Sequence, residues 1–121
     1  MADTVSTEDS ILLTVRKFIG GDENGDAFDL DLILAINSAI AVLTQLGVGP
    51  QEGFAIHDET STWRDFIGDD PRMDFIYTYI CLKVQMIFDP PTSNVVKEAK
   101  AELLREMEFR SFAQADTYLS E

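Results

Sequence analysis

Few side chains of this 121-residue chain could carry out chemistry. His57 is the only histidine, and it lies in a polar stretch with no nucleophile or carboxylate motif tied to it. A catalytic histidine needs a partner network that orients it, so we interpret His57 as an exposed loop residue. The sequence also lacks a G-x-S-x-G elbow, a glycine-rich phosphate loop and an H-E-x-x-H helix. We therefore predict that the protein is not an enzyme.

An acidic stretch that begins at Asp22 has the composition of a calcium loop. With Asp22, Asn24 and Asp26 at positions 1, 3 and 5 of an EF-hand, position 6 would be Ala27 instead of glycine. Position 12 would be Ile33 instead of glutamate. The pattern fails, and we predict a helix-entry loop whose acids lie favourably near a helix N-terminus.

Two other features resemble functional sites but have a structural explanation. Glu98, Glu102 and Glu106 share one helical face, yet the Glu-x-x-His motifs that complete a carboxylate metal site are absent. Cys81 is the only cysteine and lies in an apolar stretch, which favours a buried thiol and excludes a disulfide framework. The sequence therefore predicts no metal and no other cofactor.

The apolar stretch of residues 71–88 predicts a buried central helix. Asp70 is a good N-cap and Pro71 a good first helical residue, while the double proline at 90–91 stops the helix. Apolar side chains cover most of the circumference, so the helix must be buried on several sides. Asp74 and Lys83 interrupt the stretch, which argues against a membrane span.

Three more helices are expected around this one. The first begins near Ser6 or Thr7 and ends at Gly20, and the second covers residues 29–46. The last covers residues 94–110 with a buried stripe formed by Val96, Ala99, Leu103 and Met107.

The connection between the second and central helices is long. Its first part, residues 48–61, has one short apolar alternation and predicts an ordered loop or a short edge strand. The segment TWRDFIG then predicts about one helical turn, with Trp63 as an anchor in the core. The predicted fold is all-α: a small four-helix bundle with a long ordered loop or short β segment between helices 2 and 3. Residues 1–121 form one domain, whose ends, 1–6 and 111–121, are expected to be flexible or ordered by assembly.

The net charge of −13 excludes nucleic-acid binding through clustered phosphate contacts. Residues 1–60 hold 11 acids and two bases, a balance of −9, whereas residues 61–121 hold 11 acids and seven bases, a balance of −4. Such a surface solubilises the chain, meets a basic partner or repels a polyanion.

The order of several motifs resembles a known family. KFIGG is followed by INSAI and LTQLGVGP, then by TWRDF, and finally by IFDPPTS at the end of the central helix. Together these motifs, over about residues 10–110, look like the head-to-tail connector, or adaptor, proteins of tailed bacteriophages.

This resemblance implies a structural virion protein at the neck. Its subunits assemble with copies of themselves into a ring, usually of twelve, beneath the portal protein, and tail-side neck proteins complete the connection from capsid to tail. DNA would be a non-specific passenger through the lumen, where the acids of residues 22–31 and 52–59 would repel its phosphates. Assembly would take place in the cytoplasm of the host bacterium, without a membrane.

Five apolar residues have no evident place in a four-helix core and are candidates for contacts between subunits. They are Phe54, Ile56, Phe112, Tyr118 and Leu119. The alternative function is an acidic helical module that acts as a monomer on a basic partner. A metal-binding or enzymatic helical domain is a third hypothesis, against which the failed loop pattern counts.

Overall fold

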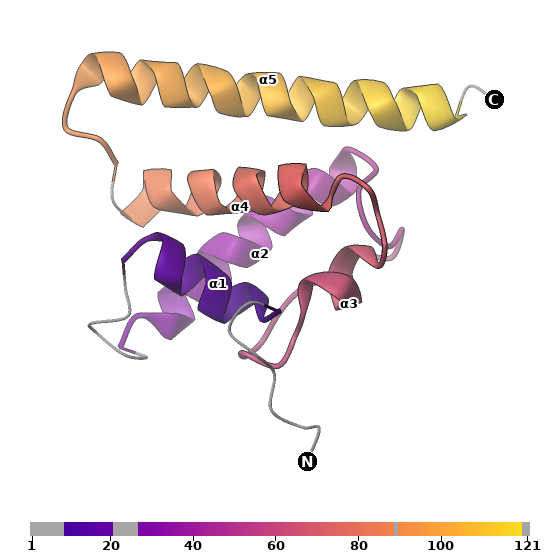
Figure 1. Ribbon diagram of the computed structural model, residues 1–121, viewed down its shortest axis with the longest axis horizontal. Helices are drawn as coiled ribbons and strands as arrows, with labels where there is room; N and C mark the ends of the chain where they lie inside the picture. Colours follow the sequence, from indigo (N-terminus) through magenta and orange to yellow (C-terminus); the bar gives the residue numbers. More distant parts are fainter. Residues whose placement is uncertain (1–8, 21–26, 89, 120–121) are drawn as a thin grey trace.

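The computed structural model describes residues 9–20, 27–88 and 90–119, with side chains as far as Arg110. Its helices are α1 (Ile11–Phe18), α2 (Asp29–Gln45), α3 (Trp63–Ile67), α4 (Met73–Phe88) and α5 (Asn94–Leu119). Figure 1 shows them in three layers, with α5 on one side of α4 and with α1 and α2 on the other. The all-α prediction is confirmed.

The finer fold prediction differs from the structure in the number of helices. The described residues form five helices because the predicted turn at Trp63 is a separate helix, α3. Residues 48–61 form an ordered loop, and the described residues contain no strand, only an isolated β-bridge between Ser10 and Thr62. A capping box closes α3, with Thr62 Oγ1 accepting from the Asp65 amide and the Asp65 carboxylate accepting from the Thr62 amide.

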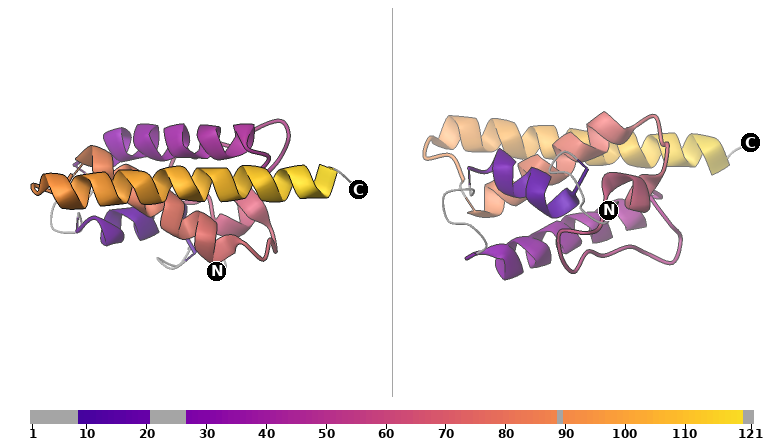
Figure 2. Two further views of the ribbon diagram at one scale, coloured as in Figure 1. Left: turned by 90° about the horizontal axis from the view of Figure 1, so that it is seen from above. Right: turned by 60° about the horizontal axis from the view of Figure 1, so that its bottom comes forward.

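The core lies where α1, α2 and α4 meet. Each of these helices packs against the other two, and the left-hand view of Figure 2 shows α2 and α1 on opposite sides of α5. The predicted face of α2 is buried, as are the inward residues of α1. The fully buried side chains that join the three helices include Ile11, Leu12, Val15, Leu32, Ile36, Ile40, Leu43, Ile76, Ile80 and Val84.

The central helix is buried on most of its circumference, as its composition predicts. Between Met73 and Phe88 only Asp74, Thr78 and Ile87 are exposed. The Asp70 carboxylate accepts the Arg72 amide at 2.8 Å, but α4 begins at Met73, two residues after the predicted first residue Pro71.

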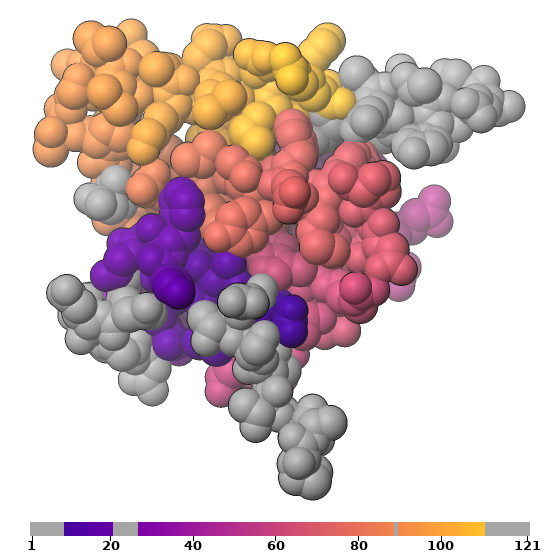
Figure 3. All heavy atoms as spheres, viewed as in Figure 1, coloured from indigo at the N-terminus to yellow at the C-terminus, as the bar shows by residue number. Residues whose placement is uncertain are grey.

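Helix α5 packs on α4 and forms an outer layer of the molecule, as the space-filling view shows (Figure 3). Within α5, the side chains of Leu104 and Met107 are buried. The Tyr79 hydroxyl donates to Glu108 Oε2 at 2.8 Å, and Lys83 Nζ lies 3.2 Å from the same oxygen. Burial and the neighbouring Glu108 carboxylate both raise the pKa of Tyr79, so the hydroxyl keeps its proton at neutral pH.

The predicted buried stripe of the last helix is wrong for three of its four members. Met107 is buried, but Val96, Ala99 and Leu103 are exposed. The polar contacts between α5 and α4 explain the difference. Glu108 faces Tyr79, and Lys100 Nζ donates to Gln85 Oε1 at 2.9 Å. These contacts set the orientation of α5 about its own axis, with Lys100, Leu104 and Glu108 on the side toward α4.

Two helix ends also differ from prediction. Ser10 caps α1, with its hydroxyl accepting the Leu13 amide at 3.2 Å, because its extended backbone pairs with Thr62. The expected caps Ser6 and Thr7 lie outside the described residues. Helix α5 runs to Leu119 instead of Arg110, and the segment after Arg110 contains no glycine or proline that would stop it. No helix within the described ranges is both long enough and apolar enough to cross a membrane.

A first prediction concerns the attachment of α5. Tyr79→Phe removes a buried hydroxyl donor to a carboxylate, so we expect the free energy of unfolding to fall by about 1 to 2 kcal/mol. Hydrogen exchange should accelerate selectively at residues 94–110. Tyr77→Phe makes the same chemical change two positions earlier, where Tyr77 packs against Trp63, and should leave the exchange of α5 unchanged. Equal effects of the two variants would contradict this role of Tyr79.

Candidate functional site

The structure places the single histidine of the chain on the surface. His57 is exposed in the loop. Its neighbour Asp58 forms a local turn, with Oδ1 accepting the Thr60 amide at 2.9 Å and the Thr60 hydroxyl at 2.5 Å. These hydrogen bonds lower the pKa of Asp58. The Asp58 contacts therefore shape the loop, and His57 is placed as predicted.

The acidic side chains also do not assemble a metal centre where the structure describes them. Among the described residues, no three His, Cys, Asp or Glu side chains come together in a group that could hold an ion. Glu98, Glu102 and Glu106 are exposed, and two of them form ion pairs along α5 with Arg105 and Arg110. The proposed calcium positions Asp22, Asn24 and Asp26 lie outside the described residues.

Cys81 is buried in α4, as its position in the sequence predicts. Burial raises the pKa of its thiol to about 12, although a hydrogen bond with Tyr77 acts in the opposite direction. A reactive cysteine needs a thiolate and access to solvent. Cys81 has neither at neutral pH, so it acts as a small apolar core residue.

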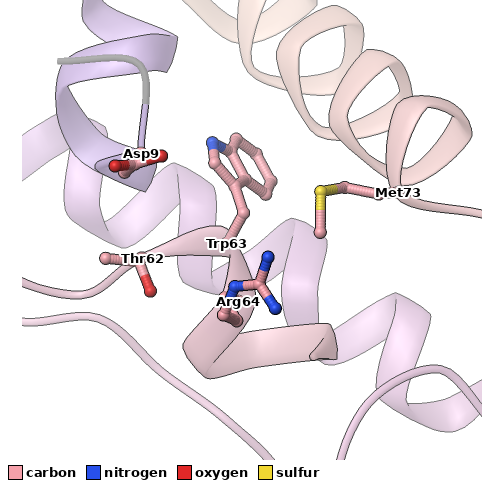
Figure 4. A pocket seen from close by; sticks show the side chains of 5 residues that line it. All are labelled: Asp9, Thr62, Trp63, Arg64 and Met73. Atoms are coloured by element: carbon pink, nitrogen blue, oxygen red, sulfur yellow. The ribbon is translucent and has the colours of Figure 1, made fainter. Parts of the chain in front are cut away.

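An open pocket of about 380 Å³ lies beside α3 (Figure 4). Its lining residues are Asp9, Thr62, Trp63, Arg64 and Met73. The indole N–H of Trp63 donates to the Thr14 hydroxyl at 3.3 Å, and the ring packs against Tyr77 with centroids 5.3 Å apart. Arg64 forms an ion pair with Asp69. The pocket therefore marks a structural junction, and the prediction that Trp63 anchors the connection is confirmed by its burial.

Backbone pairing at this junction joins the start of the described chain to the end of the long loop. The Ile11 amide donates to the Ser61 carbonyl, and the Trp63 amide donates to the Asp9 carbonyl, both at 3.1 Å. The side chains of Ser10 and Thr62 cap α1 and α3 on either side of this bridge. One short contact thus fixes the starts of two helices and one end of the loop.

Asn37 holds the middle of the loop, a role that none of the sequence motifs predicts. Its amide nitrogen donates to the Ile56 carbonyl at 2.9 Å, and its amide oxygen accepts the Ile56 amide at 2.8 Å. Both backbone groups of Ile56 are satisfied by one side chain, as buried polar groups require. The signal in the sequence is an asparagine inside an apolar helix, a position that Asn occupies unfavourably unless its side chain has a partner.

Two of the five predicted interface residues belong to the subunit's own packing. Ile56 is fully buried, so it presents no surface to another chain, and we do not carry it forward as a contact residue. Phe54 is partly buried and stacks on Phe66, with ring centroids 5.1 Å apart. The prediction placed the loop outside the core, whereas hydrogen bonds from Asn37 and stacking on Phe66 attach the loop to the core. The side chains of Phe112, Tyr118 and Leu119 lie outside the described residues.

A second prediction tests the loop attachment. Asn37→Leu leaves two buried backbone groups of Ile56 without partners, so we expect the free energy of unfolding to fall by about 2 to 4 kcal/mol. Asn37→Asp keeps the acceptor but loses the donor, and should give a smaller loss. Ser38→Ala, at the next and exposed position, is the matched control. Thermal and urea unfolding measure all three variants, and an Asn37→Leu protein as stable as the control would contradict the role of Asn37.

A third prediction follows from the buried thiol. The folded state binds the Cys81 proton up to about pH 12, whereas the unfolded thiol ionises near pH 9. This contribution to stability is complete below pH 9 and is lost as the pH rises. Between pH 9 and pH 11 the free energy of unfolding should fall more steeply than in Cys81→Ala, by up to about 1.4 kcal/mol per pH unit.

The control for this prediction is chemical reactivity. The native thiol should react with a disulfide reagent at pH 8 only at the rate of unfolding, and fully in urea. Parallel pH profiles in the two proteins, or rapid labelling of the native thiol, would contradict the assignment.

Comparison with known proteins gives the chain a family. Residues 11–117 match the family described as "Phage connector protein". Neither curated proteins nor solved structures gave a match. The matched range includes all five helices apart from the last two residues of α5, so it spans the core, the Ser10–Thr62 junction from Ile11 onward and the loop that Asn37 holds. This protein belongs to the phage connector family, whose members are structural components of the virion.

Proposed function

We propose that the chain forms a homo-oligomeric ring at the neck of the virion, beneath the portal, where it joins the capsid to tail-side proteins. The match to the phage connector family over residues 11–117 carries this proposal. A ring of twelve is the expected form, assembled in the cytoplasm of the host bacterium. DNA passes through its lumen without sequence-specific contact.

The fold suits a subunit whose function lies in its contacts. Its core of α1, α2 and α4 is closed by large apolar side chains, while α5 forms an outer layer and the loop exposes most of its side chains (Figure 1). Subunits of rings bind their neighbours and partners through such peripheral elements. Phe54 at the loop, and Phe112, Tyr118 and Leu119 at the end of α5, remain the proposed contacts to portal or tail.

Acidic side chains of the loop support a lumen that repels DNA. Glu52, Asp58 and Glu59 are exposed, and no described cation forms an ion pair with them. Asp29, from the other acidic segment, instead binds Arg16 through two hydrogen bonds of 3.1 and 2.5 Å and ties α2 to α1. The loop is therefore the stronger candidate for a surface that keeps phosphates from binding.

A fourth prediction tests this function. Native mass spectrometry of the chain, alone and mixed with the phage's portal ring, should detect portal complexes heavier by twelve copies of the 13.5-kDa chain. Negative-stain images should show the added density as one coaxial ring. A chain that remains monomeric and does not bind the portal would overturn the proposal and favour the acidic module that binds a basic partner as a monomer.

A further inference from the structure

The outer side of α2 carries large apolar side chains that the described chain does not cover. Leu30 is 71% exposed and Leu34 is 62% exposed. They occupy the side of α2 opposite the buried residues Leu32 and Ile36. We call Leu30 and Leu34 the α2 face. A helix that is apolar all round is normally covered on both sides.

A second uncovered apolar strip runs along α5. Val96 and Leu103 are 44% and 45% exposed, and Ala99 lies between them. These are the three residues that sequence periodicity assigns to a buried stripe. The polar contacts with α4 bury the neighbouring stripe instead, which leaves this one on the surface. We call Val96, Ala99 and Leu103 the α5 flank.

The α2 face and the α5 flank belong to different sides of the molecule. Helix α4 lies between α5 and α2, as Figure 1 and the right-hand view of Figure 2 both show. A contact between the two surfaces therefore cannot close within one chain. Repeated from copy to copy, it forms a head-to-tail series, which is the type of interface from which cyclic rings are built.

The charges select this pairing over contact between two α2 faces. Residues 18–63, which include all of α2, contain eight acids and no lysine or arginine. Two copies meeting through α2 would bring acids together, and although Arg16 pairs with Asp29, the segment itself supplies no cation. Residues 83–110, which include most of α5, hold five bases and five acids and so have no net charge. Lys100, which donates to Gln85, lies between Ala99 and Leu103 in the sequence, and Arg110, which pairs with Glu106, follows the α5 flank along the helix.

We infer that the α5 flank of one copy docks on the α2 face of the next copy. The inference rests on the proposed ring and names the surfaces that build it. The apolar side chains supply the association energy, because each is exposed in the single chain and dry in the assembly. The acidic surroundings of α2 meet the bases of α5, which fixes the order of the two surfaces.

The fifth prediction uses one blocked surface at a time. Leu34→Glu blocks the α2 face and Leu103→Glu blocks the α5 flank; both positions are exposed, so both variants should fold and melt like the unmodified protein. Each change should weaken self-association by about thirtyfold or more, as expected for a central interface residue. Ile87→Glu, at an exposed position on α4, is the matched control and should assemble normally.

Mixing the two blocked variants tests the polarity of the contact. Each blocked variant alone should be monomeric in light scattering after size exclusion. An equimolar mixture should form a 1:1 dimer and nothing larger, because one unmodified α5 flank meets one unmodified α2 face. A Leu34→Glu protein that dimerises alone would indicate α5-to-α5 contact, and a Leu103→Glu protein that dimerises alone would indicate α2-to-α2 contact. Either result would overturn the inference.

The same variants on the portal separate this inference from the proposed function. If the unmodified protein forms a ring on the portal and both blocked variants form it equally well, the ring stands and the assigned surfaces are wrong. If the unmodified protein neither self-associates nor binds the portal, the proposed function fails and this inference fails with it.

Discussion

The burial of α4 determines the rest of the structure. Its apolar circumference cannot be covered by one neighbour, so α1 and α2 close one side and α5 closes the other (Figure 1). The two sides are closed in different ways. The side toward α1 and α2 consists of interlocking aliphatic side chains, whereas the side toward α5 combines Leu104 and Met107 with the hydrogen bonds of Glu108 and Lys100. The contacts with α1 and α2 form the core, and the contacts with α5 attach that helix to α4.

The sequence predicts the fold correctly where a local rule decides the outcome. Proline and glycine set the ends of α4 and α2 to within about two residues, and the apolar period identifies the inner face of α2. The prediction fails at α5, because two apolar stripes lie side by side there and periodicity alone does not choose between them. The partners of Glu108 on α4 decide the rotation, and they lie at least 25 positions away in the sequence.

The loop is a second case in which distant partners decide the outcome. Nothing local predicts that Asn37 binds Ile56 or that Phe54 stacks on Phe66. The glycine at position 49 shows how close this packing is: a Cβ there would lie 2.5 Å from the Phe66 ring, and its φ of +84° also favours glycine. The interface candidates are chosen because they have no evident place in a helical core. That criterion is wrong for Ile56, which the loop places in the core.

Several side chains that could do chemistry have a structural role instead: Cys81 is buried, Asp58 shapes a turn, and Trp63 joins the loop to α1. What remains unused by the fold is apolar surface on α2 and α5 together with a large excess of acid. These two features oppose each other in a free chain, since apolar contact favours association and a charge of −13 per copy opposes it. When the nearly neutral surface of α5 on one subunit contacts the acidic surface around α2 on the next, apolar side chains are buried without bringing like charges together. A symmetric contact between two α2 surfaces would bring acids together. Charge and apolar exposure therefore both favour a ring over a closed dimer through α2.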